Sequence, residues 1–288
     1  CAFAPLYVRA LDQAVVATTV RATPAADAGV RILSFSTANM HVTTDYQHQR
    51  DLVPEALKPA LADGIPSISV GVRRLPLAAE PEGSLLWRAG LCEHVRMTSG
   101  TCPNSAGEIA ISADQARVYD QAVGSTLEVG EWDASVSRVE VSPQATLTVT
   151  GIYEQVPGDY WFGATLTGAA AGKLGFDTML TPEATLVNAV RAPAGGGEVY
   201  WAEPHQGLDL PLRPDQVTAD NIARLGAVAK DWIAYPLGVS RYGSDASDAV
   251  TVSTSLPAIA DAAAASRGQA RVTVPLLMGL SSGLSVLV

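Results

Sequence analysis

The sequence contains few charged residues, and positively charged residues are the scarcer kind. Charged residues make up 17% of the 288 positions, and 19 Lys and Arg stand against 29 Asp and Glu, giving a formal net charge of −10. Nucleic-acid-binding proteins normally carry a basic patch or run, and none is visible here. The same acidic balance argues against binding to an anionic lipid surface, and we expect the acidic residues to form a solvated surface. Apolar residues, at 48%, are too frequent for a disordered chain.

The sequence also lacks the residue patterns that mark most enzymes and metal sites. The four histidines are His41, His48, His94 and His205, and they include no pair at i and i+4 and no H-E-x-x-H motif. A solvated polar turn explains His41, Asp45 and His48 better than a metal site does. We therefore expect no catalytic residue, no cofactor, no metal site and no enzymatic activity.

Two partial motifs resemble catalytic or nucleotide-binding signatures. Gly279-Leu-Ser-Ser-Gly283 fits the G-x-S-x-G pattern of a nucleophile elbow, but no acid and histidine follow Ser281 in the sequence, and an apolar helix containing Ser and Gly explains it better. Gly168-Ala-Ala-Ala-Gly-Lys-Leu174 is similar to a phosphate loop. It has three residues where four are needed, and Leu174 replaces the Ser or Thr that would bind magnesium. We predict that neither motif is functional.

Cysteine is scarce, and its positions favour a disulfide. Besides Cys1, which we treat as incidental, the chain has Cys92 and Cys102, with a turn signal at Ser99-Gly100 between them. A disulfide here would indicate an oxidising compartment and would stabilise the fold by about 3 kcal/mol on a chain-entropy estimate. Two free buried thiols, or a metal site that includes His94, are the alternatives. The metal site lacks a convincing fourth ligand and the paired short spacings of zinc modules.

The middle of the chain contains the most regular pattern of apolar residues. The two isoleucines of Gly107-Glu-Ile-Ala-Ile-Ser112 alternate with their neighbours at the period of a half-buried strand. Ser112 suits the N-cap of a helix over residues 113–122. Alternating apolar residues predict two further strands, over 123–129 and 147–153.

The type and order of these elements resemble the extracytoplasmic domain of FtsX-like (MacB-type) ABC transporter permeases. Members of that family carry a strand of the form GE-aliphatic-x-aliphatic-S, a helix, a VG-x-x-L-x-V strand and an L-x-V-x-G-I strand. Residues 107–112, 123–129 and 147–152 match these strands. Three further stretches resemble large actinobacterial members: Ala4–Leu11, Asp159–Gly163 and Phe176–Glu183.

The rest of the chain alternates between predicted helices and strands. Helices are predicted over 6–23, 49–62 and 218–233, with a last one capped near Ser255, and strands over 30–35, 66–72, 198–201 and 250–252. The resemblance implies an α+β fold, in which both ends of the chain (1–84 and 191–288) form an outer βαβ-type subdomain. A smaller, mostly-β subdomain (85–190) is inserted between them. Trp161 and Phe162 are expected in the core rather than at an exposed contact site.

The resemblance also implies a function. The chain would be a non-catalytic extracytoplasmic domain in the cell membrane, coupling ATP-driven motion of membrane helices to export or to an extracytoplasmic partner. Its partners would be a cytoplasmic ATP-binding subunit and a second permease copy or homologue, with no nucleic acid. The first and last helices should lie side by side, since both would enter one membrane.

The uncharged segment 272–288 is expected to begin a membrane helix, although a buried helix or strand fits its hydropathy equally well. A secreted or surface-anchored binding module is the alternative function for the chain, and a secreted hydrolase fits the sequence less well because no acid, base and nucleophile can be assembled from it.

Overall fold

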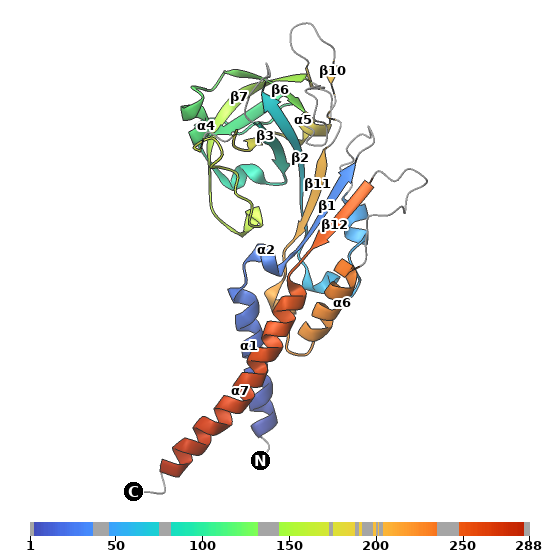
Figure 1. Ribbon diagram of the computed structural model, residues 1–288, viewed down its shortest axis with the longest axis vertical. Coiled ribbons are helices and arrows are strands. Elements are labelled where there is room, and N and C mark those ends of the chain that lie inside the picture. Colours follow the sequence, from blue (N-terminus) through green and yellow to red (C-terminus); the bar gives the residue numbers. More distant parts are fainter. Residues whose placement is uncertain are drawn as a thin grey trace.

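The computed structural model is an elongated α+β protein in which a β-rich upper part stands on paired helices (Figure 1). It describes residues 3–36, 46–74, 82–131, 144–172, 175–187, 190–191, 198–199, 201, 204–234 and 248–284. The α+β fold class expected from the sequence is confirmed.

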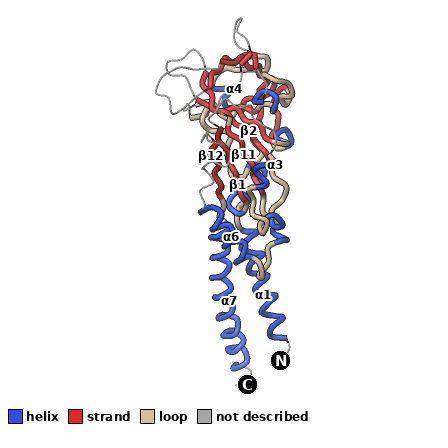
Figure 2. The backbone as a smooth tube through the Cα atoms, turned by 90° about the vertical axis from the view of Figure 1, so that its right-hand side faces the viewer, coloured by secondary structure: helices blue, strands red, loops and turns tan. Residues whose placement is uncertain are grey.

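Two antiparallel helices from opposite ends of the sequence form the lower part of the molecule. α1 (Phe3–Ala22) and α7 (Leu256–Leu284) lie side by side, and the N- and C-terminal ends lie at the same end of the molecule (Figures 1 and 2). We call this helix pair the stalk. α6 (Ile222–Ala234) packs against the upper part of α7. The expectation that the first and last helices lie side by side is confirmed.

Above the stalk, four antiparallel strands form a sheet in the order β12-β1-β11-β2. Their bounds are Val30–Ser36 for β1, Ile65–Arg74 for β2, His205–Leu210 for β11 and Asp248–Ser253 for β12. β1 and β2 run parallel with β11 between them, and β11 and β12 run parallel with β1 between them. These are two interleaved split βαβ units, the arrangement of a ferredoxin-like fold, and they draw on both ends of the chain.

The upper part is a closed ring of strands. β2 continues out of the sheet and pairs with β3 on one side and β6 on the other, and β8, β5 and β7 complete the ring. We call this ring the barrel; β4 adds to β7 outside it. The bounds are Glu82–Arg88 (β3), Val95–Gly100 (β4), Glu108–Ser112 (β5), Thr126–Glu131 (β6), Gln144–Gln155 (β7) and Met179–Leu180 (β8).

The apolar core runs continuously from the barrel into the layer between sheet and helices. Barrel residues such as Ile109 and Leu147 belong to the same buried cluster as Leu225 of α6 and Ala263 of α7. A second cluster packs outside the barrel, around Tyr153, Trp161 and Ala110. β5 is therefore buried on both faces, and the half-buried strand predicted from its two isoleucines is wrong.

The predicted helix over 49–62 is also wrong. The chain forms only α3 (Gln47–Asp51) and a 3₁₀ turn, η1 (Lys58–Ala60). Pro54 explains the interruption, because the residue before a proline is sterically driven out of the helical region. Pro59 lies within the first turn of η1, where a proline is tolerated.

Two other predicted elements are shorter than expected. Ser112 caps α4 (Ala113–Val118) as predicted, accepting a 2.9 Å hydrogen bond from the Gln115 backbone N–H. The helix stops four residues early because Asp120 adopts a left-handed backbone with φ of 51°. Of the strand expected over 198–201, the described residues show β10 (Glu198–Val199), which pairs with β9 (Val190–Arg191), while Tyr200 lies outside the described residues. The other predicted helices and strands lie close to observed ones.

Gly29 marks the closest approach between the sheet and a loop below the barrel. It joins α2 (Ala25–Ala28) to β1, and a Cβ built on it would lie 2.3 Å from Phe162 Cζ and 2.7 Å from the Leu210 carbonyl oxygen. Since its φ is −81°, the glycine is needed for space and not for backbone freedom.

We predict that Gly29→Ala lowers the free energy of unfolding by about 1–3 kcal/mol, because the added methyl group overpacks the contact with Phe162. Gly268→Ala is the control, since Gly268 lies exposed on α7 with open space around it. That change should raise stability by about 0.5–1 kcal/mol through helix propensity. Urea unfolding of both variants measures the difference, and equal stabilities would contradict the packing explanation.

Candidate functional site

Two clusters of charged side chains connect parts of the fold that are distant in sequence. One lies between the sheet and the barrel and the other lies along the stalk. We describe them as the junction and the stalk clamp.

The junction is centred on the carboxylate of Asp209, which is 3% exposed on β11. Arg31 of β1 donates to it through Nε at 2.7 Å and Nη2 at 3.2 Å. Arg88, at the end of β3, donates through Nη1 at 2.7 Å. One buried carboxylate therefore binds two guanidinium groups, one from the sheet and one from the barrel.

Both arginines also bind the junction loop, residues 156–163, which follows β7 and contains the 3₁₀ turn η3 (Asp159–Trp161). Arg31 donates to the Phe162 carbonyl at 3.0 Å, and Arg88 donates to the Tyr160 carbonyl at 2.6 Å. Each guanidinium also lies over the ring of the same residue, at 5.3 Å from the Phe162 centroid and 4.9 Å from the Tyr160 centroid. These cation–π contacts add to the hydrogen bonds in holding the loop.

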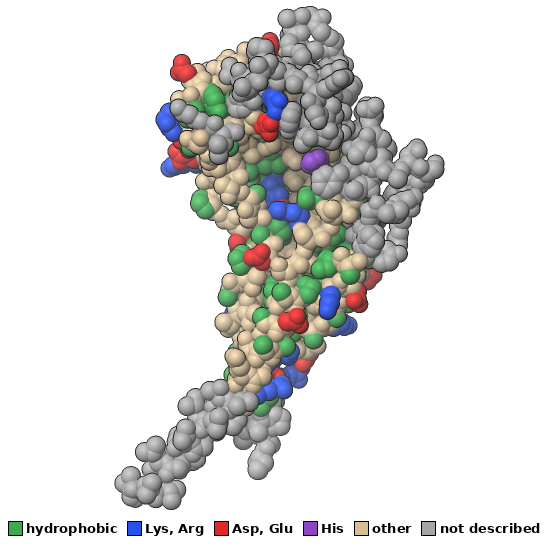
Figure 3. All heavy atoms as spheres, in the orientation of Figure 1, with side chains coloured by type: hydrophobic (Ala, Val, Ile, Leu, Met, Phe, Trp, Pro, Cys, Tyr) green, Lys and Arg blue, Asp and Glu red, His purple; other side chains and the backbone are tan. Residues whose placement is uncertain are grey.

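Tyr160 contacts a second ring as well as Arg88. His94 stacks on it with centroids 3.6 Å apart. Burial raises the pKa of Tyr160 to about 12, so the phenol stays neutral and donates to the Ala89 carbonyl at 2.9 Å. Figure 3 shows Lys or Arg side chains in the recess between the upper and lower parts of the molecule.

The stalk clamp joins α1, α7 and the turn that precedes α6. Arg271 of α7 binds the buried carboxylate of Asp12 on α1 through two hydrogen bonds, one of them 3.2 Å long. Arg9 pairs with Asp220 at 2.8 Å, and Arg267 donates to the Ala219 carbonyl at 3.0 Å. The hydrogen bonds from Arg271 hold the pKa of Asp12 below its ordinary value of 3.8, and the charge of nearby Arg267 acts in the same direction.

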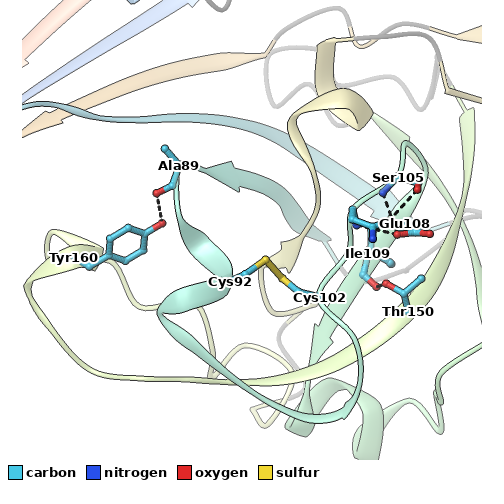
Figure 4. Close-up of a disulfide and its surroundings, with 9 residues drawn as sticks. Ala89, Cys92, Cys102, Ser105, Glu108, Ile109, Thr150 and Tyr160 are labelled. Atoms are coloured by element: carbon cyan, nitrogen blue, oxygen red, sulfur yellow. Dashed lines mark hydrogen bonds between the residues drawn. A yellow bond between two sulfur atoms is a disulfide. The ribbon is translucent and has the colours of Figure 1, made fainter.

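Cys92 and Cys102 form a disulfide that spans β4 (Figure 4). Their Cα atoms lie 6.1 Å apart, within the range that a bridge requires. Ser99 and Gly100 belong to β4, so the turn predicted there is wrong, and the chain reverses in the following residues. Because the sulfurs bind each other, they are not metal ligands, and the described part of the chain holds no group of three His, Cys, Asp or Glu suited to a metal ion.

The structure does not assemble the other residues singled out in the sequence. His41 and Asp45 lie outside the described residues, as do Lys173 and Leu174 of the motif that is similar to a phosphate loop. His48 on α3 and His205 at the start of β11 are both exposed, on separate elements. Gly279–Gly283 lies within the continuous helix α7, whereas a nucleophile elbow needs a strand–turn–helix.

The interpretation of Trp161 and Phe162 as core residues is confirmed, since each is 2% exposed. Phe162 and its neighbour Tyr160 also hold the junction, which the sequence analysis missed together with Arg31, Arg88 and Asp209. A signal was present in the sequence: Arg31 lies between Val30 and Ile32, and Asp209 lies between Leu208 and Leu210, so each charge stands between two apolar residues of a strand. Nothing in the sequence pairs them, because 178 positions separate the two.

A cavity of about 580 Å³ lies beside the junction loop, between the start of α4 and the end of β7. Its two carboxylates are already engaged, Asp114 with Arg117 at 2.8 Å and Glu154 with Arg96. The cavity therefore offers no convergent set of unengaged acids or bases.

Comparison with known proteins finds matches among solved structures only. No family model matches the chain, and no curated protein matches it. A solved structure, the extracellular domain of the noncanonic ABC-type transporter YknZ from Gram-positive bacteria, covers 77% of this chain and 99% of its own. The identity is 12% and the TM-score 0.31, values at which the similarity carries no argument about function. Within the described residues, no helix is both long enough and apolar enough to cross a bilayer.

We predict that Asp209→Asn lowers the free energy of unfolding by about 3–5 kcal/mol, because it leaves the buried Arg88 without a counter-charge. Asp114→Asn is the matched control, since Asp114 forms an exposed ion pair with Arg117. The control should cost about 0–1 kcal/mol. Urea unfolding measures both changes, and a similar small loss for the two variants would show that Asp209 does not hold the junction.

We predict that the stabilisation from Asp12 depends on pH. Because the folded pKa is depressed, this stabilisation is fully present above the ordinary value of 3.8 and is lost as pH falls through the folded pKa. Asp12→Asn should therefore be less stable than the unaltered chain at pH 7, and the difference should vanish in strong acid. Thermal unfolding from pH 7 to pH 2 measures it; a difference that is constant across this range would contradict the ion-pair explanation.

Proposed function

We propose that this chain is the extracytoplasmic domain of an FtsX-like (MacB-type) ABC transporter permease and that it catalyses no reaction itself. In this proposal the domain couples ATP-driven motion of membrane helices to export or to an extracytoplasmic partner. The cytoplasmic ATP-binding subunit acts through those membrane helices, and a second permease copy or homologue supplies the other half of the transporter.

The observation that carries this proposal is the antiparallel stalk. α1 and α7 leave the β-rich part side by side in the same direction (Figures 1 and 2), and Asp12 and Arg271 clamp them together. A clamped helix pair is suited to carry a tilt from one end of the molecule to the other. The sequence resemblance is the reason for proposing that the stalk leads to a membrane, since the family it indicates places its outer domain between two membrane helices.

The fold provides a route from the stalk to the barrel. α1 leads through α2 and Gly29 into β1, and α7 follows directly from β12, so both helices attach to the sheet. β2 runs from the sheet into the barrel and can serve as a hinge between them. The junction loop forms a second contact across this hinge. We propose that residues 1–84 with 191–288, and residues 85–190, move as two units in this way.

We predict that a disulfide between the two units slows ATP-driven transport. Ala26 and Gly163 are close enough for it, because a Cβ built on Gly163 lies 3.0 Å from the Ala26 Cβ. The backbone must move apart by a few tenths of an ångström to reach the usual disulfide spacing of about 3.5–4.5 Å. In the full-length permease, reconstituted with its ATP-binding subunit, oxidised Ala26→Cys/Gly163→Cys should hydrolyse ATP several-fold more slowly than its reduced form.

The matched control places a disulfide inside the barrel and within residues 85–190, at Thr126→Cys/Thr148→Cys, since these two residues are directly paired on the antiparallel strands β6 and β7. Oxidation of this pair should leave ATP hydrolysis nearly unchanged. If both oxidised pairs behave alike, relative motion of the two units is not part of the mechanism. If the full-length chain forms no complex with an ATP-binding subunit, the permease assignment itself fails.

A further inference from the structure

The first and last charged residues of the whole sequence meet in the stalk. Arg9 is the first charged residue, and Arg271 is the last; residues 1–8 and 272–288 carry no charge. These two arginines are 262 positions apart in sequence and line the same cavity between α1 and α7. In the described part of the chain, one level of the stalk therefore separates residues 3–8 and 272–284, which carry no charge, from the charged residues of this sequence.

The cavity at this level has a volume of about 550 Å³ and is rich in guanidinium groups. We call it the stalk cavity. Three arginines and two aspartates line it, which leaves one formal positive charge, with Val8 and Ala219 as the remaining lining; the five charged residues are Arg9, Asp12, Asp220, Arg267 and Arg271. The net charge of −10 argues against binding of the chain as a whole to an anionic lipid surface, but the chain is locally positive here. Lys and Arg side chains are visible toward the lower end of the described stalk (Figure 3).

The guanidinium groups are oriented by their existing contacts but retain donor capacity. Each arginine has five N–H donors, and the hydrogen bonds of the stalk clamp use one donor atom of Arg9, one of Arg267 and two of Arg271. Planar guanidinium groups match the oxygens of a phosphate in a bidentate geometry. The stalk cavity therefore suits a phosphate group.

Exposed apolar side chains lie next to the cavity on α1. Leu6 is 68% exposed, Tyr7 49% and Val8 39%, and they are the turn of helix that precedes Arg9. Exposed Leu beside Tyr, followed by Arg, is the composition of a segment at a membrane interface, where Tyr lies at the level of the headgroups and Arg extends toward water.

We infer that the stalk cavity binds the headgroup phosphate of a membrane lipid, with Arg9, Arg267 and Arg271 as its ligands. This inference rests on the proposed function, because it needs the stalk to stand on a bilayer. The bound phosphate would set the depth of the stalk and join α1 to α7 at the membrane surface. A lipid is favoured over a free phosphate ion because the apolar turn of Leu6 and Tyr7 and two uncharged segments adjoin the cavity.

The test is flotation of the 288-residue chain with vesicles of phosphatidylcholine containing phosphatidylglycerol. Combined Arg9→Gln, Arg267→Gln and Arg271→Gln should lower the vesicle partition coefficient by about tenfold or more, given the contribution of each arginine near an anionic surface. The control replaces by Gln three exposed arginines that also form ion pairs, namely Arg96, Arg117 and Arg213. It has the same net charge and should bind as the unaltered chain does.

Two outcomes would overturn the inference. One is equal binding by the two triple variants, which would make the interaction a matter of net charge or of the uncharged segments. The other is calorimetric binding of inorganic phosphate by the chain without vesicles that is as tight as its binding to vesicles and is abolished in the triple Arg→Gln variant, which would identify a free-anion site.

A second measurement does not depend on the stability of the triple variant. Tyr7→Trp should show fluorescence quenching, relative to the unaltered chain, by lipids brominated near the headgroup and less by lipids brominated deep in the acyl chains. An unquenched Trp would also overturn the inference. The proposed function is tested separately: slow ATP hydrolysis by the oxidised Ala26/Gly163 pair would stand even if the chain failed to bind vesicles.

Discussion

The contact between Asp209 and two arginines is the constraint on which the arrangement of this molecule depends. Arg31 belongs to the sheet, Arg88 to the barrel, and both also hold carbonyls of the junction loop. Apart from this contact, β2 is the strand that passes from sheet to barrel. A buried ion pair is a poor source of net stability, because desolvation offsets the attraction between the charges. The contact instead acts through its geometry. It holds the junction loop in one orientation relative to the sheet, and this orientation fixes the position of the barrel.

The stalk follows a different physical rule. Its ion pairs are largely exposed, apart from the Asp12 carboxylate, so each contributes little to stability alone. They fix the register of the helices. The pair of Asp12 with Arg271 determines which turns of α1 and α7 face each other, and the pair of Arg9 with Asp220 holds α1 against the turn that precedes α6. Arg9 and Arg271 also line the stalk cavity and give it its positive charge, next to the uncharged residues that precede Arg9 and follow Arg271 in the sequence. One set of residues thus serves both helix pairing and the inferred phosphate site.

Local sequence patterns were a good guide wherever one neighbour decides the conformation. Ser112 is a cap because its own hydroxyl satisfies the Gln115 N–H, and Pro54 interrupts a helix through a clash with the residue before it. Patterns failed where burial comes from a distant part of the chain. β5 looked half-buried because Ala110 is small, yet Tyr153 and Trp161 cover its other face.

Residue patterns predicted the positions of most helices and strands, the family resemblance implied the α+β class, and the composition gave the acidic charge that argues against a nucleic-acid partner. The spacing of Cys92 and Cys102 also put them within reach of each other, because ten positions allow only a short loop. The closure of the barrel, the junction and the stalk clamp became visible only in the folded chain. Asp209 meets Arg31 across 178 positions, and Asp12 meets Arg271 across 259. Pairings at such separations follow from strand order and helix packing, which no local pattern of residues encodes.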